Sequence, residues 1–332
     1  MMPAPGGPVV VKLGGRALEA EGSSGAGPGA AALRELAAEL ASLSGGSLLV
    51  HGGGAEVSAW CGRLGLAPRF EDGLRVTDPD TLEVAAAVLA GLANKRLVAL
   101  LRAHGVDAIG LSALDGGIAE CGPHPDAGRL GLVGAVRAMN AALPAALLAQ
   151  GYTPVLASIG ACGGQLLNLN ADDFAAALAA ALRAPALLLL SDTPGLRLDG
   201  ALAPRLDAAG LDAALAHPEV TGGMRPKLLA ARAALAGGVA RVAIAQWQGP
   251  GTLHSLLDGS GTGTTIAGTI AAGAGPALTG TSPAASAPAR ATPAGPAVAG
   301  TRPAASAIMD DAGERSPRTT NRPAVPAEAP RG

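Results

Sequence analysis

Short, continuously apolar runs alternate with long alanine- and leucine-rich stretches over the first 266 residues of the chain. Apolar runs without regular polar positions are typical of strands that are covered on both faces. The predicted strands are residues 8–13, 47–51, 107–111, 153–158, 187–191 and 241–245, and the predicted helices are 31–43, 55–64, 79–103, 140–150, 173–183 and 225–236. This alternation predicts an α/β fold with a largely parallel sheet and helices on both of its faces.

Residues 113–137 interrupt this alternation, because they are rich in glycine and contain the sequence CGPHPDAGRLGLVG. We expect a hairpin or lid there, at one edge of the sheet. Ligands of open α/β sheets bind beyond the carboxyl ends of the strands. The loops that follow the predicted strands are therefore the places where a functional site is expected.

The composition changes abruptly near Ile266. All five aromatic residues precede this position, whereas residues 267–332 are mainly Ala, Pro, Gly, Ser and Thr with scattered Arg. Such a segment cannot bury enough apolar surface to offset the entropy lost on ordering. We therefore predict one folded domain over residues 1–266 and a disordered tail over residues 267–332, with no catalytic role for the tail.

Charge and cysteine content exclude several classes of protein. The 332 residues carry a formal net charge of −2, which disfavours nucleic-acid binding, because nucleic-acid-binding proteins usually present a basic face. The three cysteines fit neither a metal-ligand spacing nor a disulfide framework, so a reducing compartment is expected. No signal peptide is recognisable, and no apolar run free of Gly, Pro and charge reaches the roughly 18–20 residues of a membrane span. We expect a cytoplasmic protein without membrane or nucleic-acid partners.

Two glycine turns follow the first two predicted strands. The first strand ends in KLGG, with Lys12, Gly14 and Gly15, and the second ends in HGGG, with Gly53 and Gly54 directly before a helix. Glycine lets backbone N–H groups approach an anion closely, and a helix N-terminus favours negative charge. Tight turns without a ligand are the alternative, but two turns with a lysine inside the first favour a phosphate site. Neither turn is a P-loop or a dinucleotide-binding motif.

Lysine is rare in this chain, since Lys12, Lys95 and Lys227 are the only ones. Lys12 lies near the end of an apolar strand, where it either extends to an edge or pairs with a buried anion. Lys227, in TGGMRPK, is by itself more typical of a solvated helix residue than of a functional one. Arg75 falls in a predicted connection between two helices, and its guanidinium suits a carboxylate or phosphate. A surface arginine is the simpler interpretation of that position.

Together these motifs resemble those of the N-acetylglutamate kinases, within the amino acid kinase family. The matching segments, between about residue 8 and Ile266, are VVKLGG, LLVHGGGAEV, GLRVTD, LAGLANKRLVALL, AIGLSALDGG, GLVGAV, GYTPVLASIG, LLNLNADDFAAALAAAL, LLLLSDTPGL, TGGMRPKLLAA and GTTI. The resemblance implies a three-layer αβα sandwich around a mainly parallel sheet. It also implies an N-lobe over about 8–183 for the amino acid and a C-lobe over about 184–266 for the nucleotide.

The resemblance further implies a reaction, in which ATP phosphorylates the side-chain carboxylate of N-acetyl-L-glutamate during arginine biosynthesis. The implied catalytic residues are Lys12, Lys227 and Asp172, the last of which organises the two lysines. The implied phosphate-binding residues are Gly14 and Gly15, and the implied substrate-binding residues are Gly53, Gly54, Arg75, Asn168 and Asn170. The implied nucleotide-binding residues are Ser191, Asp192, Thr193, Pro194, Gly195, Leu196, Thr221, Gly223 and Met224. Asp173 is interpreted as a plain helix-start residue.

The chemistry of this reaction fits the implied residues. The acceptor carboxylate is already ionised at neutral pH, so no general base is needed. The main barrier is repulsion between this carboxylate and the γ-phosphoryl group, which positioning and cationic groups overcome. Lys12 would cover the transferring phosphoryl group, and Lys227 would neutralise charge on the leaving side. We expect no metal site in the protein itself, with Mg²⁺ arriving on the phosphates of ATP.

Several alternatives and two departures from the family pattern accompany this hypothesis. Residues 1–7 are too short and too rich in Pro and Gly for the extra N-terminal helix of arginine-inhibited hexameric members, which predicts a homodimer without arginine inhibition. LAPRF, DTLEV and NKRLVALL also resemble the kinase that acts on carrier-protein-linked α-aminoadipate, although GLRVT, NLNAD and GGMRPK favour the acetylglutamate enzymes. Other members act on aspartate, glutamate, UMP or carbamate. A non-catalytic sensor on the same fold would be expected to lack a lysine or Asp172, and this chain has all three. Ala55 stands where many members carry proline.

Overall fold

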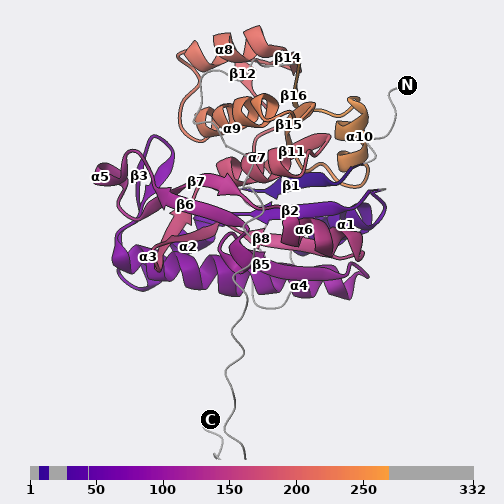
Figure 1. Ribbon diagram of the computed structural model, residues 1–332. Helices are drawn as coiled ribbons and strands as arrows, with labels where there is room; N and C mark the ends of the chain where they lie inside the picture. Colours follow the sequence, from indigo (N-terminus) through magenta and orange to yellow (C-terminus); the bar gives the residue numbers. More distant parts are fainter. Residues whose placement is uncertain (1–6, 15–27, 44, 269–332) are drawn as a thin grey trace, which may run out of the picture. The chain divides into compact units, whose positions relative to one another are not determined.

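The computed structural model describes residues 7–14, 28–43 and 45–268. An eight-stranded sheet runs through this region in the order β14-β16-β15-β11-β1-β2-β8-β5, and Figure 1 shows the last five following one another down the view. The strands are β1 (Val9–Leu13), β2 (Ser47–His51), β5 (Ala108–Ser112), β8 (Thr153–Ala157), β11 (Ala186–Ser191), β14 (Arg205–Leu206), β15 (Arg241–Gln246) and β16 (Thr264–Ala267). Neighbours pair in parallel, except that β15 and β16 are antiparallel. The prediction of a mainly parallel sheet containing all six predicted strands is confirmed.

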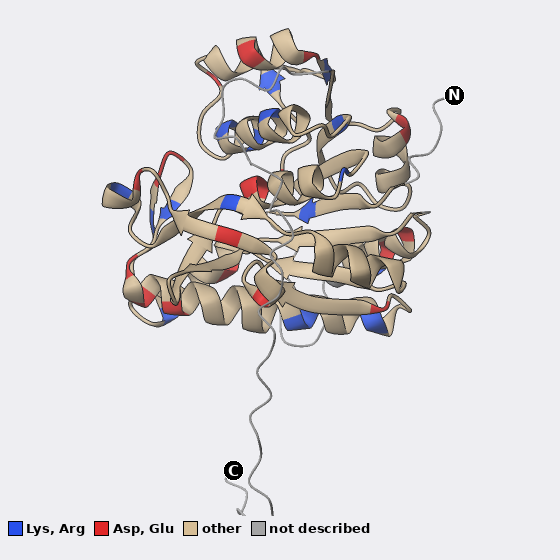
Figure 2. Cartoon of the chain, viewed as in Figure 1, with Lys and Arg blue, Asp and Glu red and all other residues tan. Residues whose placement is uncertain are grey.

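Each predicted helix is present within two or three residues of its expected bounds. The helices are α1 (Pro28–Ala41), α2 (Gly54–Arg63), α3 (Pro79–Ala86), the π-helical segment η2 (Ala87–Ala93), α4 (Asn94–Ala103), α6 (Ala142–Ala149), α7 (Ala171–Ala181) and α9 (Met224–Ala236). The prediction missed α5 (Ala127–Leu130), α8 (Ala208–Ala216) and α10 (Thr252–Asp258), which are short. Charged residues are few, and most of the ribbon in Figure 2 is uncharged.

Alternate side chains of the main sheet pack into two separate cores. Val10 of β1 belongs to the cluster that includes Phe174 of α7 and Leu228 of α9. Val9 and Val11 belong to the opposite cluster, which takes its helical residues from α1, α4 and α10. Helices therefore cover both faces of the sheet, and the predicted three-layer architecture is confirmed. Because side chains in a strand alternate, Lys12 shares the face of Val10 and points towards α7.

A second sheet has the order β6-β7-β10-β9. Its strands are β6 (Ala119–Pro123), β7 (Val133–Met139), β9 (Ile159–Cys162) and β10 (Gln165–Leu169). β6 and β7 form the antiparallel hairpin predicted for residues 113–137. The expected position at an edge of the main sheet is wrong, because the hairpin pairs with β10 instead. β10 of this sheet leads directly into α7, so the sheet determines where α7 begins.

Arg75 lies in a β-hairpin and not in a connection between helices, as the sequence suggested. β3 (Arg69–Glu71) and β4 (Leu74–Val76) pair antiparallel around Asp72 and Gly73, whose φ angles are 50° and 82°. Two positive φ angles are characteristic of the tight turns that Asp-Gly favours in hairpins. A second small hairpin joins β12 (Arg197–Leu198) to β13 (Ala201–Leu202).

α3, η2 and α4 form one continuous helix, Pro79–Ala103. Among the described residues it is the one helix long and apolar enough, by length and composition alone, to cross a membrane. Leu97 and Leu101 pack in the core below the sheet, and Val88 packs with residues of α2. A buried core helix passes the same test, so this finding is weak support for a membrane span.

Two predictions concern residues outside the described region: the phosphate-binding role of Gly15, and the tail from residue 269 onwards. The start of the predicted tail is described, because β16 includes Ala267. The folded region therefore extends slightly past the predicted boundary at residue 266.

Candidate active site

A pocket of about 260 Å³ opens at the carboxyl ends of β1, β2 and β8. Its walls come from β1, the glycine turn after β2, the β3–β4 hairpin, the end of β10 and the starts of α7 and α9. The structure brings together here nine of the predicted site residues: Lys12, Gly14, Gly53, Gly54, Arg75, Asn168, Asn170, Asp172 and Lys227.

Asp172 pairs with two lysines that come from different elements. Its Oδ1 lies 2.7 Å from Nζ of Lys12 on β1, and its Oδ2 lies 3.4 Å from Nζ of Lys227 on α9. The side chains of Lys12 and Asp172 are each 7% exposed. Burial alone would raise the pKa of Asp172, but the charges of Lys12 and Lys227 outweigh it and hold that pKa below its ordinary value. The three ionised groups together carry one positive charge, which favours an anionic ligand.

Gly14 makes room for the Lys12 side chain. A Cβ at this position would collide with Nζ of Lys12 and would approach the carbonyl oxygen of Leu190 to 3.3 Å. The Gly14 N–H donates to that same carbonyl at 2.9 Å, which fixes the end of β1 against β11. A side chain at this position would therefore have to displace the Lys12 ammonium group, which pairs with Asp172.

Arg75 is buried, and its guanidinium is only partly hydrogen-bonded among the described residues. Its Nη2 donates to the Gly54 carbonyl at 2.6 Å and to Ser58 Oγ at 2.7 Å, and its guanidinium carbon lies 4.6 Å from the ring centroid of Phe70. Its Nη1 is buried without a hydrogen-bond partner among the described residues. A guanidinium held in this way offers its remaining donor to a ligand carboxylate. The interpretation of Arg75 as a surface residue is wrong.

The capping residue of α7 is Asn170, where the sequence suggested Asp173. Asn170 Oδ1 accepts hydrogen bonds from the N–H groups of Asp172 at 2.8 Å and Asp173 at 3.1 Å. Asp173 is an exposed residue of the first turn. Asn168 donates from Nδ2 to Thr77 Oγ1 at 3.0 Å and lines the pocket. The cap fixes the first turn of α7 and so places Asp172 between the two lysines.

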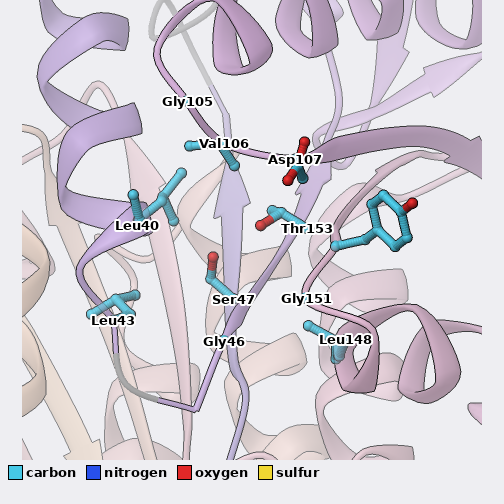
Figure 3. Close-up of a pocket in the computed structure, with 12 residues that line it drawn as sticks. Leu40, Leu43, Gly46, Ser47, Gly105, Val106, Asp107, Leu148, Gly151 and Thr153 are labelled. Atoms are coloured by element: carbon cyan, nitrogen blue, oxygen red, sulfur yellow. The ribbon is translucent and has the colours of Figure 1, made fainter.

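A second cavity of about 260 Å³ lies at the opposite ends of β2, β8 and β5, where Ser47, Asp107 and Thr153 face one another (Figure 3). Ser47 Oγ is buried without a partner among the described residues. The described lining of this cavity contains neither lysine nor arginine. Volume does not distinguish the two cavities. Cationic groups and the carboxyl ends of the strands identify the first one as the candidate site.

Residues 7–246 match the amino acid kinase family. The chain belongs to the amino acid kinase family. An acetylglutamate kinase of Methanopyrus kandleri is 46% identical over 234 residues, which cover 68% of this chain and 93% of that protein. An acetylglutamate kinase of Chloroflexus aurantiacus is 45% identical over 205 residues, covering 61% of this chain and 81% of that protein. A solved structure of N-acetylglutamate synthase from Neisseria gonorrhoeae superposes with a TM-score of 0.68 at 29% identity, covering 80% of this chain and 61% of that chain.

The nucleotide-binding residues expected of an amino acid kinase do not line the first pocket in the described structure. Ser191 and Thr193 share a hydroxyl hydrogen bond of 2.9 Å, and the Leu196 N–H donates to Thr264 Oγ1 at 2.8 Å. The first bond holds the start of the loop after β11, and the second joins this loop to β16. Leu196 as a whole is 1% exposed, and its N–H and carbonyl oxygen both take part in hydrogen bonds within the protein, to Thr264 and Ala203. Nucleotide binding by the loop and by Thr221, Gly223 and Met224 stays a prediction.

Several pocket residues of this amino acid kinase were absent from the sequence interpretation. Ser158 lies at the end of β8, Leu89 and Val133 supply apolar walls, and Phe70 stacks on Arg75. The Asp-Gly pair at residues 72–73 was a usable signal for the hairpin that carries Phe70 and Arg75. The position of Ser158 directly after a predicted strand was a weaker signal.

Proposed function

We propose that this chain is an acetylglutamate kinase, which transfers the γ-phosphoryl group of ATP to the side-chain carboxylate of N-acetyl-L-glutamate in arginine biosynthesis. The observation that carries the proposal is the pairing of Lys12, Asp172 and Lys227 in one pocket with Arg75, which keeps a free donor. The M. kandleri and C. aurantiacus relatives, which are both acetylglutamate kinases, support it.

The substrate would be oriented by its α-carboxylate. Nη1 of Arg75 is the free donor for that group, and Asn168 lies in the same wall. The side-chain carboxylate would then extend towards the glycine turn after β2. This carboxylate is ionised at neutral pH and attacks directly, so the protein contributes orientation rather than proton transfer.

The phosphoryl group would be transferred beside the two lysines. Lys12 would neutralise the transferring group, Lys227 the leaving side, and the N–H groups of Gly53 and Gly54 would bind phosphoryl oxygens. Asp172 would keep both lysines in place, because each of its oxygens faces one of them.

Magnesium would be bound by the phosphates of ATP and not by a site in the protein. The pocket carboxylate, Asp172, is already paired with two lysines, and the described residues contain no group of three or more His, Cys, Asp or Glu suited to a metal. When bound, Mg²⁺ neutralises phosphate charge and favours oxygen ligands.

The remaining features of the proposal are the organisation and the setting of the enzyme. We place the amino acid in an N-lobe of about 8–183 and the nucleotide in a C-lobe of about 184–266, contacting Ser191–Leu196, Thr221, Gly223 and Met224. The predicted homodimer and cytoplasmic location belong to the same proposal. Analytical ultracentrifugation at several protein concentrations would test the dimer.

The activity is tested by trapping the acyl phosphate product with hydroxylamine. Purified protein with ATP and Mg²⁺ is given N-acetylglutamate, glutamate or carrier-linked α-aminoadipate in parallel. We expect turnover with N-acetylglutamate and at most trace turnover with the other two acceptors. Absence of turnover with N-acetylglutamate would contradict the proposal, and preference for the carrier-linked acceptor would assign the chain to lysine biosynthesis.

The roles of the lysines are tested by Lys12→Ala and Lys227→Ala. Each should lower kcat at least about tenfold, which corresponds to roughly 1.4 kcal/mol of transition-state stabilisation. Arg232→Ala is the matched control, because Arg232 lies on the same helix as Lys227 and, within the described part of the chain, pairs only with Asp212, at 3.7 Å. A change of less than tenfold in both lysine variants would remove the charge-stabilisation roles.

A further inference from the structure

His51 ends β2 directly before the glycine turn, and its ring is fully buried. Nδ1 lies 2.9 Å from the carbonyl oxygen of Gly52, and Nε2 lies 3.1 Å from Nδ2 of Asn94. A carbonyl oxygen only accepts hydrogen bonds, so Nδ1 must carry a proton and donate it. Burial, with a smaller contribution from the charge of Lys95, lowers the pKa of His51 to about 4. The ring is therefore neutral near pH 7, and Nε2 accepts from Asn94.

The orientation of the Asn94 amide is fixed by its other neighbours. Asn94 is fully buried, and its Nδ2 also lies 3.0 Å from the carbonyl oxygen of Val155. Its Oδ1 accepts from Nζ of Lys95 at 3.1 Å. Exchanging the positions of Oδ1 and Nδ2 would place an oxygen against carbonyl oxygens and an N–H donor against a lysine, so the amide has one favourable orientation. Gly110 is part of this arrangement, because a Cβ there would collide with Oδ1 of Asn94.

The hydrogen bond to Gly52 determines which way the next N–H group points. In a planar trans peptide the C=O and the N–H of one unit point in opposite directions. Because His51 holds the Gly52 carbonyl on the buried side, the Gly53 N–H points away from the ring. Gly52, Gly53 and Gly54 all line the pocket that contains Lys12. The Gly53 N–H has no acceptor among the described residues.

The long helix Pro79–Ala103, which carries Asn94, also contacts the glycine turn directly. Leu89 Cδ2 would lie only 2.8 Å from a Cβ at Gly53, so the apolar side chain packs closely against the turn. Leu89 belongs to η2, and Asn94 is the first residue of α4. The long helix thus supports the turn both directly, through Leu89 of η2, and indirectly, through Asn94 of α4 and His51.

We propose that His51, oriented by Asn94, is a positioning residue that fixes the Gly52 carbonyl and thereby directs the Gly53 N–H at the transferring phosphoryl group. This inference rests on the proposed kinase function. His51 contacts no substrate in this role, and it donates and accepts no proton during the reaction. Its contribution is a preorganised N–H donor, which stabilises charge without reorganising during the step.

Two substitutions at position 51 separate positioning from simple packing. In His51→Asn the side-chain amide is able to donate to Gly52 in place of Nδ1, whereas His51→Leu fills a similar volume without any donor. We expect His51→Leu to lower kcat by roughly 10- to 100-fold, with KM for both substrates within about threefold, because the lost interaction acts in the transition state. His51→Asn should retain kcat within about threefold of the wild type. Equal loss of kcat in the two variants would overturn the proposal, as would a loss confined to KM.

A second measurement tests the hydrogen bonds without relying on catalysis or on the folding of His51→Leu. In protein carrying ¹⁵N-labelled histidine, the His51 ring should remain the neutral Nδ1–H tautomer between about pH 5.5 and 8. Its resonances are identified by their absence from His51→Asn. A protonated Nε2 in this range would overturn the proposal. If wild-type protein showed this tautomer but no turnover of N-acetylglutamate, the proposed function would fail while the hydrogen-bond geometry stood.

Discussion

Lys12 and Lys227 come from opposite ends of the described chain, and Asp172 is the one carboxylate that pairs with both. The pairing explains how a carboxylate can lie in a site that is proposed to bind ATP and a second anion. An unpaired carboxylate there would repel both ligands, whereas the paired one leaves a net positive charge. The cost of burying three ionised groups is offset only while all three are present.

We therefore expect Asp172→Asn to destabilise the protein by about 3 kcal/mol, because it leaves Lys12 buried without a counter-charge. Asp80→Asn makes the same change of charge at an exposed position in the first turn of α3 and should stay within about 0.5 kcal/mol of the wild type. Urea unfolding of the two variants makes the comparison. Equal destabilisation would mean that the pairing contributes little.

His51 gives a prediction for the dependence of stability on pH. Its pKa is about 4 in the folded protein against an ordinary value of 6.5, so the unfolded chain binds the extra proton first as pH falls. The stability associated with the neutral ring is complete above pH 6.5 and is lost as pH falls from 6.5 towards 4. The loss amounts to about 3 kcal/mol. The difference in unfolding free energy between wild type and His51→Asn should shrink by this amount across that window. A constant difference would show that the ring titrates normally.

The sequence predicted the participants of the charged cluster but not the connection between His51 and Asn94. Lys12, Asp172 and Lys227 were identified through a family resemblance, since no spacing rule links residues so far apart. Asn94 reads in sequence as an unremarkable helix position. Its role depends on the meeting of β2 and a distant helix, which only the fold specifies.

Among the elements, the β3–β4 hairpin connects the two sides of the candidate site. A Cβ at Gly73 would lie 2.9 Å from the carbonyl oxygen of Gly222, in the turn that precedes α9. The element that carries Arg75 thus touches the turn before the helix that carries Lys227. The hairpin escaped prediction because RFEDGLRV contains no long apolar run, although its Asp-Gly pair signals a turn.

Gly73→Ala tests this contact, with Gly65→Ala as a matched control. Both glycines have similar positive φ angles, 82° and 76°, but a Cβ at Gly65 would meet nothing within 4 Å. Each substitution should cost about 1 kcal/mol of stability from backbone strain. Only Gly73→Ala should also lower kcat/KM, by roughly tenfold, because it separates the hairpin from the turn and disturbs the placement of Arg75 against Lys227. Equal kinetics in the two variants would show that the contact is incidental.

In the molecule as a whole, the periodic pattern of the sequence specified the parallel sheet and its two helical layers. Short elements such as α8, α10 and β16 escaped prediction, because a few residues carry too little periodic signal. The second sheet was missed for another reason. Its strands β9 and β10 are joined to residues 119–139 by pairing that the local sequence does not reveal.

The described site residues all lie between Lys12 and Lys227, and the sheet that supports them ends with β16 at Ala267. A chain ending at residue 268 should therefore keep kcat within about twofold of the full chain and an unchanged unfolding midpoint. Hydroxylamine trapping and thermal unfolding of both chains make the test. A loss of activity in the shortened chain would assign a role to residues 269–332.

The seven residues of η2 set the rotational phase of the long helix. Each residue advances an α-helix by about 100°, so the wider π-helical turn determines which side of α4 faces β2. If these seven residues took up regular α-helical geometry instead, everything after them would turn further, by about the advance of one residue. Asn94 would then leave His51, while Leu97 and Leu101 would leave the core. Deleting one residue within Ala87–Ala93 should therefore be tolerated, because the segment can return to α-helical geometry and keep Asn94 beside His51. Deleting two residues would turn Asn94 away and so alter a glycine turn that is distant in the chain.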